Sequence, residues 1–344
     1  MPGVGGRRQA KGTDIRCLTA AAALPRRKLE VGDDGDTVLH RACTRARAPC
    51  VLAGRCDISD HEEMGGRVRR VYLDRSAWAE LVRDEDRGGE AISRLRRAVR
   101  SRKVGIALSE AVVDETFPVL LKSVEDGKRH LSLLLEFADW KKGIVRRPKD
   151  LIRQQATAAL KGERIPPSFG SSYETRTVVR QLPDLMRKNP SLVAREAARI
   201  EKQKSDFEAG IDELRSEMLL AKANVTGRPP KLADAIDRNA SFCIRSILKQ
   251  LGFEPLSDAE VEAVLRAPAP RMYAAVHVAY VLFQVVQQLA PQHGDGYDLL
   301  HAVSATATGE FVSCDKRLRE LVQAAGGGSP VVSDLVTFIE SVIS

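Results

Sequence analysis

The chain has 344 residues, of which 43% are hydrophobic and 29% charged, and its formal net charge is +8. This length predicts two packed units or one unit with a large insertion, and this composition excludes a disordered chain and a membrane protein. The excess of Lys and Arg favours polyanionic partners, because these side chains neutralise phosphates. Aromatic residues make up only 5%, so phosphate contacts rather than base stacking would carry such binding.

Residues 1–67 are rich in Arg, Ala, Gly and Asp and show no sustained helical or strand periodicity, so we expect a disordered N-terminal extension. Patterned sequence begins just after Met64, which suggests that natural translation starts there. The order of a signal peptide is missing, so we expect a cytoplasmic protein without membrane contacts. A loose zinc site is a weak alternative for part of the extension, because its spacings fit no standard zinc finger: His40, Cys43, Cys50, Cys56 and His61.

The first patterned segment, residues 68–135, predicts the order strand, helix, helix, strand, helix. These elements span residues 71–73, 76–82, 90–100, 104–108 and 110–124. The last segment, residues 290–344, repeats the alternation, with a helix at 297–308, a strand at 310–313, a helix at 316–324, a strand at 331–332 and a helix from residue 335. Such alternation is typical of α/β proteins with a parallel sheet, and we expect the two segments to share one sheet.

The middle segment, residues 136–289, has the start and stop signals of helices. Asn189 followed by Pro190 opens a helix. Its apolar residues recur at steps of seven, four, three and four: Ile200, Phe207, Ile211, Leu214 and Met218. This spacing predicts a seam like that of a coiled coil, which residues 226–230 interrupt.

Two further helices are expected in this segment, one ending before Gly252 and one opened by a capping box of Ser257 and Glu260. The apolar stretch 272–286 is too short to cross a bilayer comfortably and predicts a buried helix. We therefore expect residues 136–289 to form an all-helical insertion within an α/β domain.

Four acidic residues are candidates for a functional site. Asp74 and Asp315 each follow a strand and precede a helix, and each alone is most simply an N-cap. Glu115 shares a helical stripe with two valines, and a carboxylate on an apolar face needs a partner or a metal. Asp298 begins a helix whose small residues allow close packing against the sheet.

The carboxyl ends of parallel strands share one edge, so Asp74, Asp298 and Asp315 should converge there. Hard oxygen ligands suit Mg²⁺ or Mn²⁺, with substrate phosphate and water completing the shell. Asp114 is an alternative to Glu115, although we expect it to point off the apolar stripe. Two more acids are reserve candidates: Asp295 and Glu310.

Four motifs together resemble those of the PIN-domain nucleases, including the toxin ribonucleases of toxin–antitoxin pairs. They are a strand followed by Asp, Leu-Ser-x5-Glu, Tyr-Asp-x2-His-Ala and Val-Ser-x-Asp. The resemblance covers residues 68–135 and 290–344 and implies a three-layer α/β/α domain with a central parallel sheet. It matches four residues to the family's catalytic, metal-binding acids: Asp74, Glu115, Asp298 and Asp315. The segment between the second and third acids is much longer than in compact toxins and carries no recognisable signature.

The activity implied by the resemblance is that of an endoribonuclease, which hydrolyses RNA phosphodiester bonds with metal-activated water. Asp74, Glu115 and Asp298 would hold the first ion, and Asp315 would hold a second ion or orient the water. Ser313 stands where the family usually has a Thr or Ser beside the site. His301 contacts phosphate or hydrogen-bonds a ligand carboxylate, and a core-packing role is an equal alternative.

RNA is the expected partner, with single-stranded DNA, an antitoxin or inhibitor protein, and a homodimer as open alternatives. Seven basic residues form either a phosphate-tracking surface or a merely solvated face: Lys141, Lys142, Arg146, Arg147, Lys149, Arg228 and Lys231. The second function hypothesis is a non-catalytic nucleic-acid-binding or scaffold protein that retains the PIN shape. A phosphatase or phosphotransfer enzyme with Asp74 as nucleophile ranks last, because the second Asp and the later Lys of those folds are missing.

Overall fold

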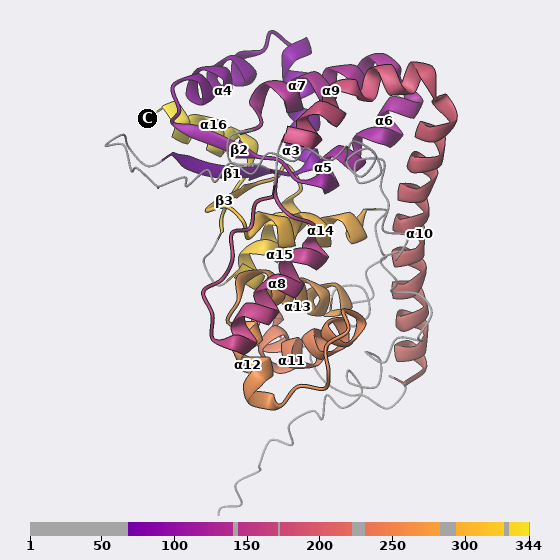
Figure 1. Ribbon diagram of the computed structural model, residues 1–344, viewed down its shortest axis with the longest axis vertical. Helices are drawn as coiled ribbons and strands as arrows, with labels where there is room; N and C mark the ends of the chain where they lie inside the picture. The colour runs from indigo at the N-terminus through magenta and orange to yellow at the C-terminus, as the bar shows by residue number, and fades with distance from the viewer. Residues whose placement is uncertain are drawn as a thin grey trace, which may run out of the picture.

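The computed structural model describes residues 68–139, 144–170, 173–221, 231–282, 294–326 and 330–343. This part of the chain is mostly helical and contains a sheet of four parallel strands (Figure 1). The strands are β1 (Arg69–Leu73), β2 (Val104–Ala107), β3 (Glu310–Val312) and β4 (Val331–Ser333), in the spatial order β2-β1-β3-β4. The first and last segments therefore share one sheet, which confirms the expected α/β organisation. The extension expected over residues 1–67, with its loose zinc alternative, lies outside the described residues.

The order in which the strands are connected reverses in the middle of the sheet, between β1 and β3. From β1 the chain passes through α3 (Arg75–Asp86) and α4 (Glu90–Arg100) to β2, and from β3 it passes through α15 (Lys316–Gly326) to β4 on the other side. The register aligns Leu73 with Val312, so the residues that follow them emerge side by side. In open α/β sheets such a reversal marks the position where ligands bind, at the carboxyl ends of the two strands, and we call this position the crevice between β1 and β3.

Helices lie on both sides of the sheet. Figure 1 shows α4 and α16 (Leu335–Ile343) above it and α14 (Asp295–Ala305) and α15 below it. As a result Val71, Tyr72 and Leu73 of β1 are all fully buried. A parallel strand that is covered on both faces has no solvent side, so successive residues are apolar or fully hydrogen-bonded.

The helix expected over residues 110–124 is divided, and in this respect the prediction is wrong. The chain forms α5 (Glu110–Asp114) and α6 (Thr116–Lys122), followed by α7 (Val124–Phe137). Pro118 has no N–H to donate to the carbonyl four residues earlier, which explains an interruption between α5 and α6. Glu115 occupies this junction.

The middle segment is built from six helices within its described residues. They are α8 (Pro148–Lys161), α9 (Tyr173–Lys188), α10 (Pro190–Ala221), α11 (Leu232–Gln250), α12 (Asp258–Leu265) and α13 (Pro268–Tyr280). The expected helix start at Pro190 and the capping box of Ser257 and Glu260 are confirmed, and Gly252 follows α11 with a positive φ. Residues 226–230 lie outside the described residues. The segment is not entirely helical, because Val145 forms an isolated β-bridge with Ser109, which lies just after β2.

Helix α13 lies at the centre of the helical part, in contact with α8, α11, α14 and α15. Nearly every residue of α13 is buried, which confirms the buried helix expected from residue 272 as far as it is described. The long helix α10 runs along one side of the molecule, past α6 and α14 (Figure 1). In the described part of the chain, the helices lack the combination of length and apolarity that spanning a membrane requires.

Gly127 allows α7 to pack closely against α6, and replacing it should destabilise the fold. A Cβ at this position would lie 2.2 Å from Leu120 Cδ2 and 2.8 Å from Leu120 Cα. We expect Gly127→Ala to lower the free energy of unfolding by about 1–3 kcal/mol, measured by urea denaturation. Gly309→Ala is the control, because a Cβ there meets nothing within 4 Å; equal stabilities of the two variants would contradict the prediction.

Candidate functional site

Asp74 follows β1 and is buried at the start of α3. Its carboxylate accepts hydrogen bonds from the Ala77 N–H at 2.9 Å and from the hydroxyls of Ser76 and Ser313 at 2.8 and 2.7 Å. Burial raises the pKa of Asp74 above its ordinary value, although the charge of His301 and these hydrogen bonds act in the opposite direction. Asp74 is therefore an N-cap, as its position alone predicts, and also a buried carboxylate that joins β1 to β3.

Ser313 connects two of the candidate acids. Its hydroxyl donates to Asp74 and accepts from the backbone N–H of Asp315 at 2.9 Å. Asp315 is partly exposed, and its carboxylate accepts from the Leu318 N–H at 3.0 Å at the start of α15. The structure thus brings Asp74 and Asp315 together in the crevice between β1 and β3.

Glu115 is buried and surrounded by cationic side chains. Its Oε2 lies 2.7 Å from Nε2 of His301, and its Oε1 lies 3.3 Å from Nζ of Lys204 and 3.6 Å from the guanidinium of Arg75. Burial alone would raise the pKa of Glu115, but the hydrogen bond and charge of His301, with the charges of Lys204 and Arg75, hold the pKa below its usual value. Glu115 is therefore an ionised buried carboxylate.

His301 lies at the middle of a buried chain of hydrogen bonds. Its Nδ1 is 2.8 Å from the Tyr72 hydroxyl, which is 2.6 Å from the Ser109 hydroxyl, and its Nε2 bonds Glu115. Burial opposes protonation, but the Tyr72 hydroxyl and the carboxylates of Glu115 and Asp74 raise the pKa of His301 well above its ordinary value. His301 therefore hydrogen-bonds a candidate ligand carboxylate, one of the three roles that the sequence left open.

Asp298 lies in the first turn of α14 and is half-buried. The Tyr280 hydroxyl donates to its Oδ2 at 3.3 Å. Burial raises the pKa of Asp298 to about 8, with the nearby charges of Asp315, Asp295 and Glu115 acting in the same direction and His301 against them. Three other carboxylates thus lie close enough to Asp298 to disfavour its ionised form, and a cation at this position would relieve that repulsion.

Asp114 is also buried, although it was expected to point off the apolar stripe that carries Glu115. The interrupted helix turns it towards α10, where the Arg199 guanidinium lies 3.3 Å from its Oδ2. Burial and the nearby charge of Glu110 raise the pKa of Asp114 to about 7, against the lowering effect of Arg199. Asp114 thus forms a buried ion pair with the helical segment, next to the candidate site.

The two reserve candidates have different positions. Asp295 is buried at the start of α14, and its Oδ1 lies 3.7 Å from the Arg317 guanidinium. Glu310 is the first residue of β3 and pairs with Arg69 at 2.7 Å. Because Glu310 lies at the amino end of its strand, it is at the opposite edge of the sheet from the candidate site.

The expected basic surface is only partly described. Lys141, Lys142 and Arg228 lie outside the described residues. Arg147 is half-buried and forms an ion pair with Glu110, with one hydrogen bond at 2.8 Å. Its guanidinium is engaged inside the protein, so it is not a simple solvated charge. The other residues have different surroundings: Arg146 donates to the Pro167 carbonyl, Lys149 is half-buried in α8, and Lys231 is exposed before α11.

Lys204 was not among the residues singled out from the sequence. It lies on α10, four residues after Ile200 and three before Phe207, so it shares their apolar seam. A lysine at an inward-facing position of such a seam was the signal in the sequence that could have identified it as a buried cation. Tyr72 and Arg75 are also adjacent to the candidate site, on either side of Asp74, and only the assembled structure shows their contacts.

The donor chemistry at the crevice fits a hard divalent cation, since it consists of carboxylate oxygens with an excess of negative charge around Asp298. The ligands are not pre-assembled, however. In the described residues, no group of three or more His, Cys, Asp or Glu side chains is arranged to hold a metal ion. Glu115 faces a lysine ammonium instead, which is itself a cation at this position.

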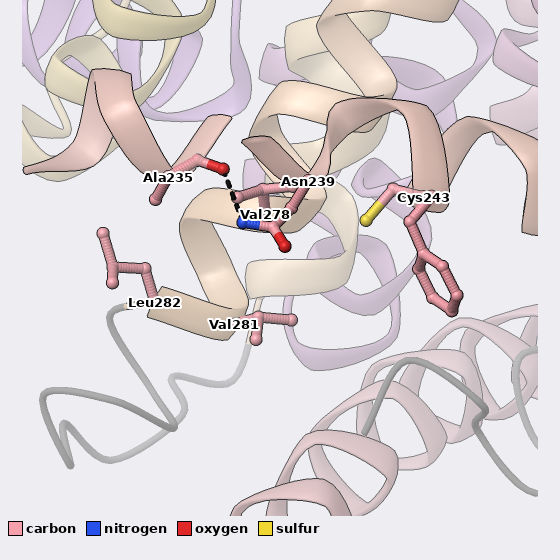
Figure 2. Close-up of a pocket in the computed structure, with 7 residues that line it drawn as sticks. Ala235, Asn239, Cys243, Val278, Val281 and Leu282 are labelled. Carbon is pink, nitrogen blue, oxygen red and sulfur yellow. Dashed lines mark hydrogen bonds between the residues drawn. The ribbon is translucent and has the colours of Figure 1, made fainter. Parts of the chain in front are cut away.

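A separate hollow of about 30 Å³ lies between α11 and α13 (Figure 2). Asn239 at its wall donates to the Ala235 carbonyl at 2.8 Å, and Cys243 and Val278 also line it. Its lining contains no carboxylate, and its volume is sufficient for about two water molecules. It is therefore distinct from the acidic crevice.

A comparison of the chain with protein-family models, with curated proteins and with solved structures gives no match.

The chain of hydrogen bonds through Tyr72 should stabilise the fold. Tyr72→Phe would leave the Ser109 hydroxyl and Nδ1 of His301 without this partner, and we expect the free energy of unfolding to fall by about 1–3 kcal/mol. Urea denaturation would measure the change. Tyr297→Phe is the comparison, because it removes a single hydrogen bond, to Gln203, that is only partly buried. We expect it to have a smaller effect, and a larger loss of stability in Tyr297→Phe than in Tyr72→Phe would contradict the prediction.

Asp298→Asn should stabilise the protein at alkaline pH. The pKa of Asp298 is about 8 in the folded protein against 3.8 for the free side chain. The folded state therefore binds this proton more tightly than the unfolded state. The stability of the wild type declines as the pH rises above the pKa of the free side chain, and the loss is complete once the pH exceeds the pKa in the folded protein. In EDTA, we expect the variant to exceed the wild type by about 1–3 kcal/mol near pH 9, with a smaller difference near pH 5. A variant that is less stable at both values would show this expectation to be wrong.

Proposed function

We propose that this chain is a metal-dependent endoribonuclease with a PIN-like α/β/α domain. The observation that carries the proposal is the convergence of acids from distant segments at the carboxyl ends of β1 and β3, where the order of strand connections reverses. Asp74 follows β1, Asp315 follows β3, and Glu115 is linked to Asp74 and Asp298 through the charge of His301. Several carboxylates buried close together are unusual in a purely structural core, because burying each charge is unfavourable without a cation beside it.

Asp298, Asp74 and Glu115 are the residues that would hold the ion, and Asp315 would hold a second ion or orient water. A bound Mg²⁺ or Mn²⁺ supplies a water of lowered pKa and stabilises negative charge on the phosphate. Ser76 and Ser313 orient the carboxylate of Asp74 by donating hydrogen bonds to it. The positions of these donors match those expected of groups that fix ligand orientation.

Two cationic side chains are available for other tasks at the site. His301 orients Glu115 and is itself held by Tyr72, which supports the positioning role over direct contact with phosphate. Arg75 is the accessible cation, since its side chain is 45% exposed while it lies 3.6 Å from Glu115. We propose that Arg75 contacts a phosphate of the substrate. The net charge of +8 favours a polyanion in the same way.

The second candidate is a non-catalytic nucleic-acid-binding or scaffold protein of the same shape. The observation that favours it is the engagement of both Glu115 oxygens by cationic side chains of the chain itself. This function predicts RNA binding that is independent of divalent metal and of the acids. We rank it second, because it gives no reason for the excess negative charge around Asp298.

Cleavage of a mixed RNA pool by the full-length protein tests the proposal. We expect cleavage with Mg²⁺ or Mn²⁺, none with EDTA, and a loss of at least about a hundredfold in Asp74→Asn and Asp298→Asn. Asp237→Asn is the matched control, because Asp237 is an exposed acid on α11. A DNA pool of the same sequences separates ribonuclease from single-stranded DNA nuclease activity.

Binding of the same RNA, measured in parallel, distinguishes the two candidates. A wild type that binds RNA but never cuts it, with both Asn variants binding equally well, would reject the nuclease and support the scaffold. Cleavage that persists in Asp74→Asn and Asp298→Asn would instead place the activity elsewhere on the chain.

A further inference from the structure

Lys204 is a buried lysine that the helical segment inserts among the candidate acids. Its side chain is 3% exposed, and its Nζ lies 3.3 Å from Oε1 of Glu115. The ammonium also lies 5.2 Å from the centre of the Tyr297 ring, within the range of a cation–π contact. A buried ammonium requires a counter-charge, and Glu115 is the buried carboxylate that supplies it.

Both carboxylate oxygens of Glu115 already face cationic side chains. His301 occupies Oε2, and Lys204 and Arg75 both face Oε1. A divalent cation bonded to Oε1 would lie a few ångströms from the Lys204 ammonium, and the repulsion between two cations at that distance is strong where water is excluded. The Lys204 ammonium therefore competes with a divalent ion for this oxygen.

We propose that Lys204 is an internal cation which a divalent metal must displace from Glu115, so that metal binding is coupled to the position of α10. The inference rests on the proposed function, because it takes Glu115 as a metal ligand. The ammonium neutralises Glu115 until the ion replaces it. The helical segment then acts as a device that sets the metal affinity of the site.

The packing of α10 explains how Lys204 is held in place. On one side of Lys204, Arg199 pairs with Asp114. On the other side, Phe207 packs against α14, where a Cβ at Gly296 would lie only 3.1 Å from Phe207. These contacts fix α10 on both sides of the lysine, so its displacement requires the side chain to rotate out of the crevice or α10 to move away from α14.

Mn²⁺ affinity of the full-length protein, measured by isothermal titration calorimetry, tests this inference without any reference to cleavage. We expect Lys204→Met to bind Mn²⁺ roughly tenfold or more tightly than the wild type, because the competing charge is gone. Lys204→Arg keeps the charge and should remain close to the wild type. Lys202→Met is the matched control, since Lys202 is exposed on the same helix, and it should also remain close to the wild type.

The competition should depend on Glu115. In a Glu115→Gln background, Lys204→Met should no longer raise Mn²⁺ affinity, which a double-mutant cycle would measure. Thermal unfolding checks that each variant is folded, and Lys204→Gln provides the same test if Lys204→Met does not fold.

The possible failures are distinguishable. If the wild type binds Mn²⁺ in a Glu115-dependent manner and Lys204→Met binds no more tightly, the role of Lys204 is wrong and the nuclease proposal stands. If the wild type, Lys204→Met and Lys204→Gln all fail to bind Mn²⁺, the metal site itself is rejected, and the proposed function is rejected with it.

Discussion

The backbone pairing of β1 with β3 is the interaction on which the rest of the structure depends. It joins residues that are more than 200 positions apart and aligns Leu73 with Val312. The same pairing continues one step further, where the N–H of Asp74 donates to the Val312 carbonyl at 3.1 Å. Asp74 and Ser313 are adjacent for this reason, and a shift in register would separate them. The crevice and its acids are thus consequences of sheet topology.

Burying carboxylates at this edge of the sheet is electrostatically unfavourable, and the protein compensates the charge of some of these carboxylates but not of others. Glu115 is ionised, because its pKa is lowered, and the positive charges of His301 and Lys204 balance its negative charge. Asp298 has no comparable partner among the described cations, and burial raises its pKa to about 8. This contrast between neighbouring carboxylates is typical of functional sites, where stability is given up for charge placement. Within the described residues, the helical segment contributes to the balance through Lys204 of α10.

Much of the sheet and its acidic edge could be predicted from the sequence, because the relevant signals are local. Alternating strands and helices predicted the parallel sheet, and Asp74 and Asp315 stand at strand ends that must share one edge. The burial of Glu115 followed from its apolar stripe, even though the helix that carries it is interrupted. That interruption was missed, and with it the burial of Asp114, because Pro118 was not weighed within the expected helix.

The contacts between the helical segment and the acids could not be predicted in the same way. Lys204 lies about 90 residues from Glu115 along the chain, and helical periodicity shows only that it faces inward, not what it faces. The register of α10 against α14 depends on the close approach of Phe207 to Gly296, which has no local signal. For the same reason, the pairing of Arg199 with Asp114 appears only in the assembled structure.

The most direct test of the metal site is a crystal structure of the full-length protein grown with Mn²⁺, in which anomalous scattering locates the ion. We expect one or two anomalous peaks in the crevice between β1 and β3, bonded to the carboxylates of Asp74 and Asp298, with the Lys204 ammonium moved away from Glu115. Mn²⁺ bound only at other positions, or a crevice without an anomalous peak at saturating Mn²⁺, would contradict the assignment of these acids as metal ligands.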